Sequence, residues 1–290
     1  MKDVSSQRNT PHYPVMLEQV LDICKVKNGG LFIDCTFGAG GYSNAILSNP
    51  NTRVIALDRD ANVSEHVDKI KKKYKNRFHF YNSKFSQLNK IIKKNQEIDC
   101  IIFDLGLSSM QISNFKRGFS FNAQGKPDMR MGLNSISAYD AINNLDEKTL
   151  TSVFKLFGEE KEAFRIAKNI VYARKLKPIT TIPDLVKIVK RSKKKDFKKR
   201  INISTQVFQA LRIFVNKEIS ELIEGLINAT NILKNDGKII IISFQSIEDK
   251  IVKFFFTNFS ENSSRGSRYY PDSNQKKILF KKYKNKVLRP

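Results

Sequence analysis

The sequence predicts an α/β fold in which a mostly parallel sheet, with helices on both faces, carries an inserted all-helical region. Between residues 31 and 104, short apolar runs alternate with polar helical stretches, which is the pattern of a parallel sheet. From about 112 to 200 the sequence has no β-rich run. A continuous β-branched run, Lys238 to Ser243, then restores the strand pattern and suits a central position in the sheet.

The elements follow from these patterns in chain order. We expect strands at 31–35, 53–57, 78–81 and 100–103, separated by helices at roughly 42–48, 61–74 and 86–95. Helical periodicity then covers 138–143, 147–157 and 159–175, and another helix follows Pro183 and ends in the basic run 191–195. One long helical region is expected from Thr205 to Leu233, then a turn at Asp236-Gly237, and a last strand at 278–280.

The pattern of alternating strands and helices therefore stops at about residue 111 and resumes after residue 216. This organisation predicts a discontinuous core, residues 1–111 and 217–290, and a helical insertion, residues 112–216, that recognises the substrate.

The first strand runs directly into a glycine-rich turn, Gly38-Ala39-Gly40-Gly41, with a helix behind it. Such a turn lets a ligand approach the backbone, and the helix start offers free N–H donors. Asp58 lies 20 residues beyond Gly38, at the end of the second strand, where a carboxylate can accept hydrogen bonds from both ribose hydroxyls of an adenosine. The alternative is an ordinary tight β–α connection with a surface Asp.

The spacing of the turn narrows the choice of cofactor. It reads G-x-G-G rather than G-x-G-x-x-G, and the chain has no G-x-x-x-x-G-K-[ST] loop. A nucleoside without phosphates, such as S-adenosylmethionine, is therefore favoured over NAD or ATP.

The composition indicates a polyanionic partner. Lys and Arg number 52 against 28 Asp and Glu, a formal net charge of +24. Solvated lysines without a partner, part of them from A/T-rich codon usage, are the alternative. The longest apolar runs are too short to span a bilayer.

The cysteines indicate the redox environment of the protein, and the histidines indicate whether a metal site is expected. Cys24, Cys35 and Cys100 form no C-x-x-C pair and no even disulfide framework, so we expect reduced thiols and a cytoplasmic protein. Three scattered histidines give no metal-ligand cluster, so no metal site is expected.

Asp104 ends the fourth expected strand and begins the segment D-L-G-L-S-S-M-Q. Ligands of open parallel sheets bind outside the carboxyl ends of the strands, which places Asp104 near the glycine turn. The run from Arg117 to Phe121 then interleaves a cation with aromatic rings, as proteins do when they hold an unstacked base beside a phosphate. The alternatives are that Asp104 caps a helix, and that Phe119 and Phe121 form a hydrophobic plug.

Nine motifs, which follow one another along the chain, together carry a resemblance to one protein family. They are H-Y-P-V-M-L at His12, D-C-T-F-G-A-G-G-Y-S at Asp34, A-L-D-R-D at Ala56, D-L-G-L-S-S-M-Q at Asp104, R-G-F-S-F at Arg117, P-D-M-R-M at Pro127, G-E-E at Gly158, F-Q-A-L-R-I at Phe208 and S-F-Q-S-I-E-D at Ser243. Over residues 12–255 the chain resembles the bacterial small-subunit rRNA cytosine-N4 methyltransferases.

This resemblance implies a class I S-adenosylmethionine-dependent methyltransferase fold (Rossmann-like) with an inserted helical substrate domain. The implied reaction is methyl transfer to the exocyclic N4 of a cytidine in the decoding region of 16S rRNA, and the implied partner is 16S rRNA or the small ribosomal subunit, with a homodimer possible. The implied cofactor residues are Gly40, Gly41, Tyr42, Asp58 for the ribose, Phe85 for the adenine, Asp104 and Gln111.

The sequence also gives candidates for catalysis and for RNA binding. The N4 amine is a poor nucleophile, so we expect a polar acceptor beside it, supplied by Asp104 together with Ser108 or Ser109. The cytosine must also be extruded to reach the methyl group. The expected RNA contacts are Arg117, Phe119, Phe121, Arg130, Lys193, Lys194, Lys195, Lys198, Lys199 and Arg212.

Three departures from the family pattern leave other functions open. Gln245 stands where the family usually has His, Gln206 stands where it usually has Arg, and the basic C-terminal element is missing. An RNA-binding ribosome-assembly factor that has lost catalysis is therefore one alternative. A cytosine-C5 methyltransferase is another, but its thiolate nucleophile has no good candidate, since Cys35 and Cys100 lie inside expected strands.

Overall fold

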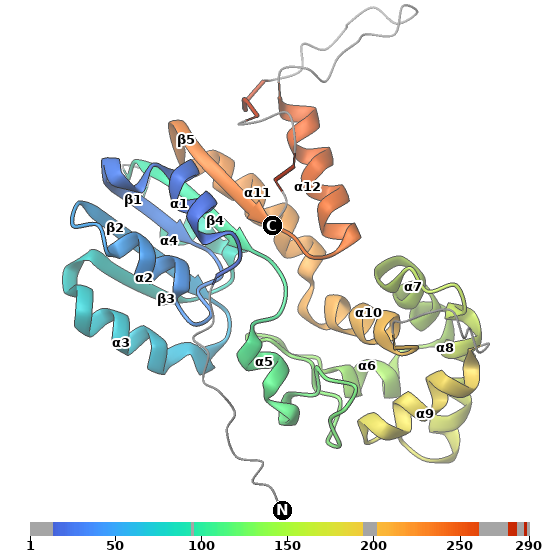
Figure 1. Cartoon of the computed structure of the whole chain (residues 1–290). Helices are drawn as coiled ribbons and strands as arrows, with labels where there is room; N and C mark the ends of the chain where they lie inside the picture. The colour runs from blue at the N-terminus through green and yellow to red at the C-terminus, as the bar shows by residue number, and fades with distance from the viewer. Residues whose placement is uncertain (1–13, 94–95, 194–201, 261–277, 283–286, 289–290) are drawn as a thin grey trace, which may run out of the picture.

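The structure is a computed structural model that describes residues 14–93, 96–193, 202–260, 278–282 and 287–288 (Figure 1). Its centre is a five-stranded sheet in the order β3-β2-β1-β4-β5, and every neighbouring pair is parallel. The strands are β1 (Gly30–Asp34), β2 (Thr52–Asp58), β3 (Phe78–Asn82), β4 (Ile98–Asp104) and β5 (Leu233–Ile242). The predicted α/β fold with a parallel sheet is therefore confirmed.

Helices cover both faces of this sheet because strand side chains alternate between the faces. Phe32 and Val54 belong to a core shared with α1 (Leu17–Cys24), α2 (Gly41–Leu47) and α3 (Ser64–Tyr74). Ile33 and Phe103 belong to a second core, shared with α4 (Leu88–Ile91) and α11 (Glu218–Ile232). The helix α12 (Ser246–Phe259) follows β5.

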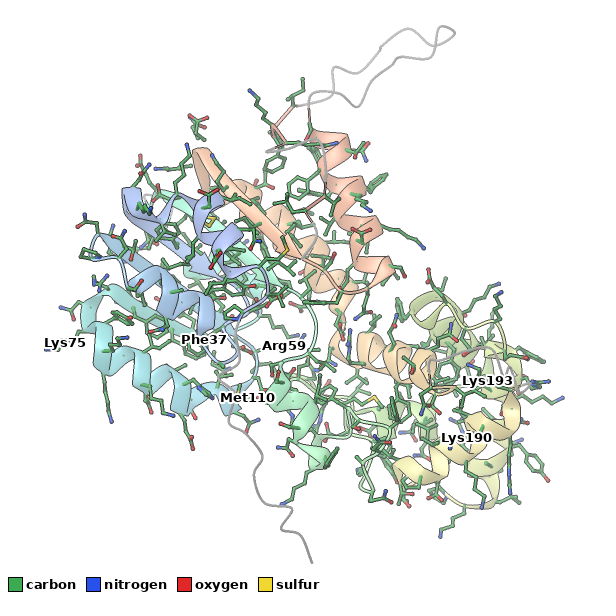
Figure 2. All side chains as sticks on the ribbon, in the orientation of Figure 1. Phe37, Arg59, Lys75, Met110, Lys190 and Lys193 are labelled. Carbon is green, nitrogen blue, oxygen red and sulfur yellow. A yellow bond between two sulfur atoms is a disulfide. The ribbon has the colours of Figure 1, made fainter. Side chains whose placement is uncertain are left out.

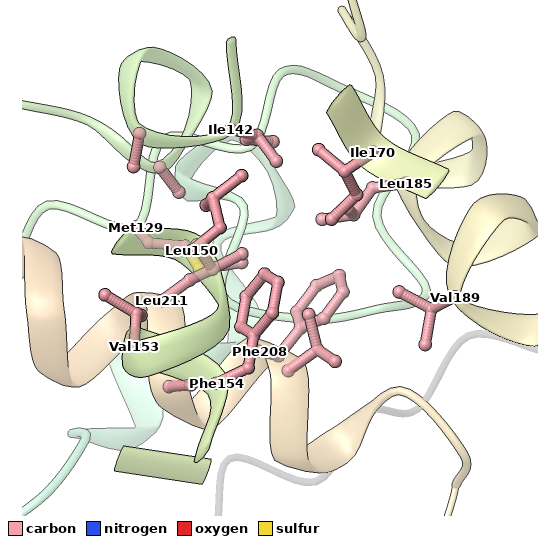
Figure 3. Packing of buried hydrophobic residues seen from close by; sticks show 14 of the residues in the cluster. Met129, Ile142, Leu150, Val153, Phe154, Ile170, Leu185, Val189, Phe208 and Leu211 are labelled. Atoms are coloured by element: carbon pink, nitrogen blue, oxygen red, sulfur yellow. The ribbon is translucent and has the colours of Figure 1, made fainter. Parts of the chain in front are cut away.

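The segment between β4 and α11 is helical and has a core of its own. Its helices are α5 (Ser109–Ser113), α6 (Ala138–Asn144), α7 (Glu147–Gly158), α8 (Ala163–Leu176), α9 (Ile182–Ser192) and α10 (Thr205–Asn216). Figure 3 shows Phe154, Ile170, Leu185 and Leu211 from four of these helices packed together, and each is fully buried. Figure 1 shows this segment beside the sheet, joined to it by the chain after β4 and by α10.

The long helix expected from Thr205 to Leu233 is broken at Lys217, whose φ of 52° is left-handed. Two contacts fix the break. The side-chain nitrogen of Asn216 donates to the carbonyl of Met129 (2.8 Å), and Arg212 pairs with Glu218 across the turn. Met129 lies 87 residues from Asn216, outside the local helical pattern, which is why periodicity alone predicted one helix.

Other differences concern the ends of elements. The fifth strand begins at Leu233, so the turn expected at Asp236-Gly237 is an irregularity in its pairing with β4. Among the described residues β5 pairs only with β4 and is an edge strand, not the central strand that its composition suggested. The expected helix at 86–95 has its α-helical part only at 88–91, and the strand expected at 278–280 is a single bridge between Ser260 and Phe280.

The expectation of three separate thiols is wrong for two of them. Cys24 at the end of α1 is joined to Cys100 in β4 as a disulfide, with Cα atoms 5.8 Å apart, and Cys35 is free and buried. The two partners are 76 residues apart in the chain, so sequence spacing did not predict the pairing.

Candidate active site

A cavity of about 320 Å3 opens at the carboxyl ends of the strands. The turns after β1, β2, β3 and β4 line one part of it, and the first turns of α11 and α12 line the other. Eight of the nine residues expected at the cofactor or in catalysis line this cavity: Gly41, Tyr42, Asp58, Phe85, Asp104, Ser108, Ser109 and Gln111. Gly40 is the ninth and does not line it.

Gly40 has a structural reason to be glycine. Its φ of 80° is left-handed, and a Cβ there would lie 2.8 Å from ring atoms of Phe37. Gly40 therefore lets the turn pack against Phe37, while Gly41 next to it lines the cavity. Figure 2 shows Phe37 at this turn.

Asp58 at the end of β2 fastens the glycine turn to the neighbouring loop. Its two carboxylate oxygens accept hydrogen bonds from the backbone N–H groups of Gly38 and Asp60, both at 2.8 Å. Burial is the main reason why the pKa of Asp58 is raised to about 6. Because each carboxylate oxygen has a second lone pair, Asp58 can still accept hydrogen bonds from a ribose.

Asp104 is the least satisfied carboxyl of the site. Its backbone N–H donates to the Thr36 hydroxyl (2.8 Å), but its Oδ1 is buried and has no hydrogen-bond partner among the described residues. Burial, followed by the nearby charge of Asp34, raises the pKa of Asp104 to about 7; the Tyr42 hydroxyl lies near enough to offset part of this shift, but it donates its hydrogen bond to the carbonyl of Val15. A buried acceptor without a donor is costly, so this oxygen fits a ligand that brings its own N–H group.

Tyr42 and Asp34 hold the first turn of α2 against this carboxyl. The hydroxyl of Tyr42 donates to the carbonyl of Val15 at 2.6 Å, and the hydroxyl of Ser43 donates to Asp34 at 2.6 Å. Burial raises the pKa of Asp34, whose side chain has no exposed surface. The carboxyl of Asp34 is therefore held beside Asp104 by the fold.

Ser108 begins α5 and forms a capping box with Gln111. The N–H of Gln111 donates to the hydroxyl of Ser108 (3.3 Å), and the N–H of Ser108 donates to Oε1 of Gln111 (3.0 Å). The side-chain nitrogen of Gln111 also donates to Asp60 at 2.9 Å. Ser108 and Gln111 thus position the wall of the cavity, and Ser109 follows as the first residue of the helix.

Phe85 belongs to the cavity wall and to the core at once. Its ring meets Phe103 edge to face, with centroids 5.4 Å apart. A Cβ on Gly225 of α11 would lie 2.6 Å from this ring, so a small residue there leaves room for Phe85.

The structure gives three of the expected RNA-binding cations other partners. Arg117 pairs with Asp60 and donates to the carbonyl of Met131 (3.0 Å). Arg212 donates to both oxygens of Glu218, at 2.9 and 2.8 Å, and this pair is largely buried. These two arginines join parts of the fold, so we no longer expect them to contact phosphates.

Lys193 is the third of these cations. Its ammonium group lies 2.5 Å from Glu160 and donates to the carbonyl of Ile203 at 2.8 Å. Arg130 is different, because its pair with Asp128 is exposed and leaves the guanidinium open to solvent. Figure 2 shows Lys190 and Lys193 on the helical segment, at the far end of the molecule from Phe37. Lys194, Lys195, Lys198 and Lys199 lie outside the described residues.

The two aromatic residues expected at RNA are part of the helical core. Phe119 is only 8% exposed, and the guanidinium of Arg117 lies 5.5 Å from its ring centre. Phe121 packs edge to face on Phe208, with centroids 6.2 Å apart. The plug alternative therefore describes these rings better than a base-stacking role.

Two residues of the site received no role from the sequence. Arg59, next to Asp58, donates to the carbonyls of Gly132 (3.1 Å) and Asn216 (2.9 Å) and so joins the sheet to the helical segment (Figure 2). Glu248 in the first turn of α12 is buried and lines the cavity. Both lie within motifs that identified the family, and that membership was the available signal.

Neither a cluster that could bind a metal nor a helix that could span a membrane occurs among the described residues. They contain no group of three or more His, Cys, Asp or Glu side chains placed to hold a metal ion. Within the same ranges, no helix has both the length and the apolar character needed to cross a bilayer.

Known proteins resemble this chain along most of its length. The family model described as the MraW methylase family matches residues 9–290. The Ribosomal RNA small subunit methyltransferase H of Rickettsia prowazekii is 44% identical over 262 residues, which is 90% of this chain and 85% of the relative. Proteins of the same name from Parvibaculum lavamentivorans and Ehrlichia ruminantium are 37% and 41% identical, over 100% and 87% of this chain and 86% and 85% of their own lengths.

Solved structures add little to these matches. An rRNA methylase from Streptococcus thermophilus aligns with a TM-score of 0.27 and 17% identity, over 33% of this chain and 57% of that one. A likeness of this size is too low to inform the fold, which is established by the sheet itself. The sequence matches are sufficient: the chain belongs to the MraW methylase family and is an S-adenosylmethionine-dependent methyltransferase.

Proposed function

We propose that this protein transfers the methyl group of S-adenosylmethionine to the exocyclic N4 of a cytidine in the decoding region of 16S rRNA. The observation that carries the proposal is the buried Asp104 oxygen without a donor, at the place where cofactor and substrate amine have to meet. The relatives, named Ribosomal RNA small subunit methyltransferase H, and the nine ordered motifs support the RNA substrate.

The cavity residues divide into those that hold the cofactor and those that act on the amine. Asp58 binds the ribose, Phe85 lines the adenine pocket, and Gly41 and Tyr42 border the amino acid end. When bound, S-adenosylmethionine supplies a methyl group already activated on a sulfonium. The protein therefore has to align the N4 nitrogen with that methyl carbon and exclude competing geometries.

Asp104 acts on the amine. The lone pair of N4 is delocalised into the pyrimidine ring, and an acceptor for one N–H favours a pyramidal, more nucleophilic nitrogen. As the carbon–nitrogen bond forms and the sulfur–carbon bond breaks, one N4 proton leaves for the carboxylate of Asp104. The raised pKa, about 7, suits a group that accepts a proton at neutral pH.

The helical segment 112–216 is proposed to bind the RNA, and residues 1–111 and 217–290 are proposed to form the methyltransferase core. The separate core of the helical segment supports this division. We place the reaction in the cytoplasm, with 16S rRNA or the small subunit as partner, and a homodimer stays an expectation from the resemblance. Of the predicted cations, Arg130 and the lysines outside the described residues remain the candidates for phosphate contacts.

The two alternatives fare differently. A cytosine-C5 mechanism needs a thiolate, but burial raises the pKa of Cys35 and Cys100 is joined to Cys24. An assembly factor without catalysis is favoured by one observation only, the buried Gln245 Oε1 that lacks a hydrogen-bond donor where the family usually has His. Gln206 instead has a structural role, since it donates to the carbonyl of Glu159 at 3.2 Å.

One experiment separates these functions. The protein is incubated with S-adenosylmethionine and small subunits that lack the modification, and the methylated nucleotides are mapped by mass spectrometry. We expect one new N4-methylcytidine in the decoding region. Cofactor binding without any methylated nucleotide would favour the assembly factor, and a C5 product would overturn the proposal.

A further inference from the structure

Two side chains at the start of α12 carry acceptors that no step above uses. Glu248 is 3% exposed, its carboxylate accepts a long hydrogen bond, 3.3 Å, from the backbone N–H of Phe244, and the backbone N–H of Gln245 also lowers its pKa. Gln245, at the N-cap, has a buried Oε1 without a donor. Glu248 lines the cavity, and the neighbouring Gln245 Oε1 is a buried acceptor without a donor, which is unfavourable for folding, so this turn suits a ligand that brings donors.

The surrounding charges do not neutralise Glu248. Arg212 is the cation that lowers its pKa, and both the Nε and the Nη2 of Arg212 are hydrogen-bonded to Glu218. Burial, followed by the charge of Glu218, raises the pKa of Glu248 to about 7. Glu248 is therefore an acceptor without a counter-ion of its own.

The order of the strands places this turn on the substrate side of the cavity. The order β3-β2-β1-β4-β5 puts Phe85 and Asp58, the adenosine end, on one side and Asp104 at the end of β4. Glu248 follows β5 and so lies beyond Asp104, away from the adenosine end. The same turn also contacts the helical segment, since the hydroxyl of Ser246 donates to Glu159 at 3.0 Å.

An aromatic ring stands at the rim of the same place. Phe244, between β5 and α12, is 59% exposed although it lines the cavity. Its ring lies close to Gly106, where an added Cβ would approach it to 3.5 Å. An exposed ring at the rim of this cavity suits stacking against an extruded base.

We propose that the first turn of α12 forms the subsite for the target base, in which Phe244 stacks on the pyrimidine and Glu248 accepts a hydrogen bond from its N4 amine. This inference rests on the proposed function. Glu248 and Asp104 each accept one N–H of the amine, which leaves the nitrogen lone pair free to face the methyl carbon. The departing proton goes to Asp104, and Glu248 keeps its own protonation state throughout.

The arrangement also selects the base. Uracil carries an oxygen acceptor where cytosine carries the amine, and a carboxylate opposite that oxygen offers no donor when it is ionised. Glu248 is therefore a specificity-determining residue as well as a catalytic one.

The test uses the full-length protein, S-adenosylmethionine and small subunits that lack the modification. Glu248→Gln is paired with Asp249→Asn, the adjacent carboxylate on α12, which is bound to Lys253 on the helix surface. Phe244→Leu is paired with Phe254→Leu, which is 72% exposed on the same helix and outside the cavity. Calorimetry with S-adenosylmethionine is run on every variant, and circular dichroism confirms that each is folded.

We expect Glu248→Gln to lower kcat/KM about 10-fold, because a neutral amide oxygen accepts a hydrogen bond more weakly than a carboxylate and the amide nitrogen cannot accept one. Phe244→Leu should raise KM for the small subunit about 10-fold, since stacking is lost while the hydrocarbon surface is partly kept. Both controls and all cofactor affinities should stay within about 2-fold of wild type.

The outcomes separate this inference from the proposed function. A wild-type protein that does not methylate small subunits refutes the proposed function. If the wild type is active and either site variant matches its control, the base subsite is elsewhere and the inference is overturned. A loss of cofactor affinity in Glu248→Gln would also overturn it, because that result puts Glu248 at the cofactor instead of at the base.

Discussion

Substituting Asp104 by Asn tests the proposed chemistry most directly. The change keeps the size of the side chain and removes its basicity. With a pKa of about 7, the wild-type carboxyl is ionised in about one molecule in ten at pH 6 and in about nine in ten at pH 8. If the ionised form accepts the N4 proton, its share of the rate rises about 10-fold between these two pH values.

The assay is single-turnover methyl transfer to small subunits with enzyme in excess, because this isolates chemistry from product release. At pH 8 we expect Asp104→Asn to be slower than wild type by about 100-fold or more. Glu248 ionises over the same range, since its pKa is also raised to about 7. The decisive quantity is therefore the difference in pH slope between wild type and Asp104→Asn, about one order of magnitude in rate.

The control is Asp68→Asn, an exposed carboxylate on α3, which should change neither rate nor slope. Cofactor affinity is measured for each variant by calorimetry. Near-normal methylation by Asp104→Asn with unchanged cofactor affinity refutes the reasoning, because the amine then needs no acceptor at this position.

Although Asp104→Asn should slow methyl transfer, the same substitution should make the folded protein more stable at pH 8. The pKa of Asp104 in the folded protein, about 7, lies above the ordinary value of 3.8 for an aspartate side chain, so the folded state holds the proton more tightly than the unfolded chain. The contribution of this group to stability is therefore greatest below pH 4 and is lost as the pH rises to 7. Asp104→Asn should unfold at higher denaturant concentration than wild type at pH 8, and this advantage should fade toward pH 4. A variant less stable than wild type at pH 8 would contradict the cause assigned to the shift.

Three further predictions concern the frame around the site. Arg212→Ala leaves the largely buried Glu218 without a partner and should lower the free energy of unfolding by about 3–5 kcal/mol in urea titrations, while Arg130→Ala, at an exposed pair, should change it by less than about 1 kcal/mol. Equal effects would show that burial does not separate the two pairs. Gly40→Ala forces a left-handed φ and a clash with Phe37, so it should destabilise the protein by about 1–3 kcal/mol and weaken cofactor binding in calorimetry; a neutral result contradicts the packing role. Replacing Lys194, Lys195 and Lys198 together by Gln should reduce the slope of log affinity for RNA against log salt by about 2 to 3, and an unchanged slope identifies them as bystanders.

The sheet could be predicted from the sequence because its signals are local. Each strand is a short apolar run that ends near a turn residue, as at Asp34, Asp58 and Asp104, and the strand ends meet at one edge of a parallel sheet. The cavity at that edge is therefore lined by residues that the sequence had already predicted for the site.

The remaining features depend on partners far along the chain. Arg117 looked like a phosphate ligand because it stands beside aromatic residues, but its partner Asp60 is 57 residues away. The break at Lys217 depends on Asn216 reaching Met129, 87 residues earlier. Glu248 looked like an ordinary acidic residue in the first turn of a helix, where the dipole favours it, and only the cavity shows another use.

The three residues at the end of β2 show how the cofactor end and the helical segment are fixed together. Asp58 holds the glycine turn through the N–H of Gly38, and Arg59 holds the carbonyls of Gly132 and Asn216. Asp60 forms an ion pair with Arg117 and accepts a hydrogen bond from the side-chain nitrogen of Gln111. Three consecutive side chains therefore fasten the glycine turn, the break between α10 and α11, and the wall formed by α5. Arg117, which its sequence pattern assigned to RNA, joins the helical segment to the sheet instead, so we expect the phosphate contacts to come from cations that are not already paired.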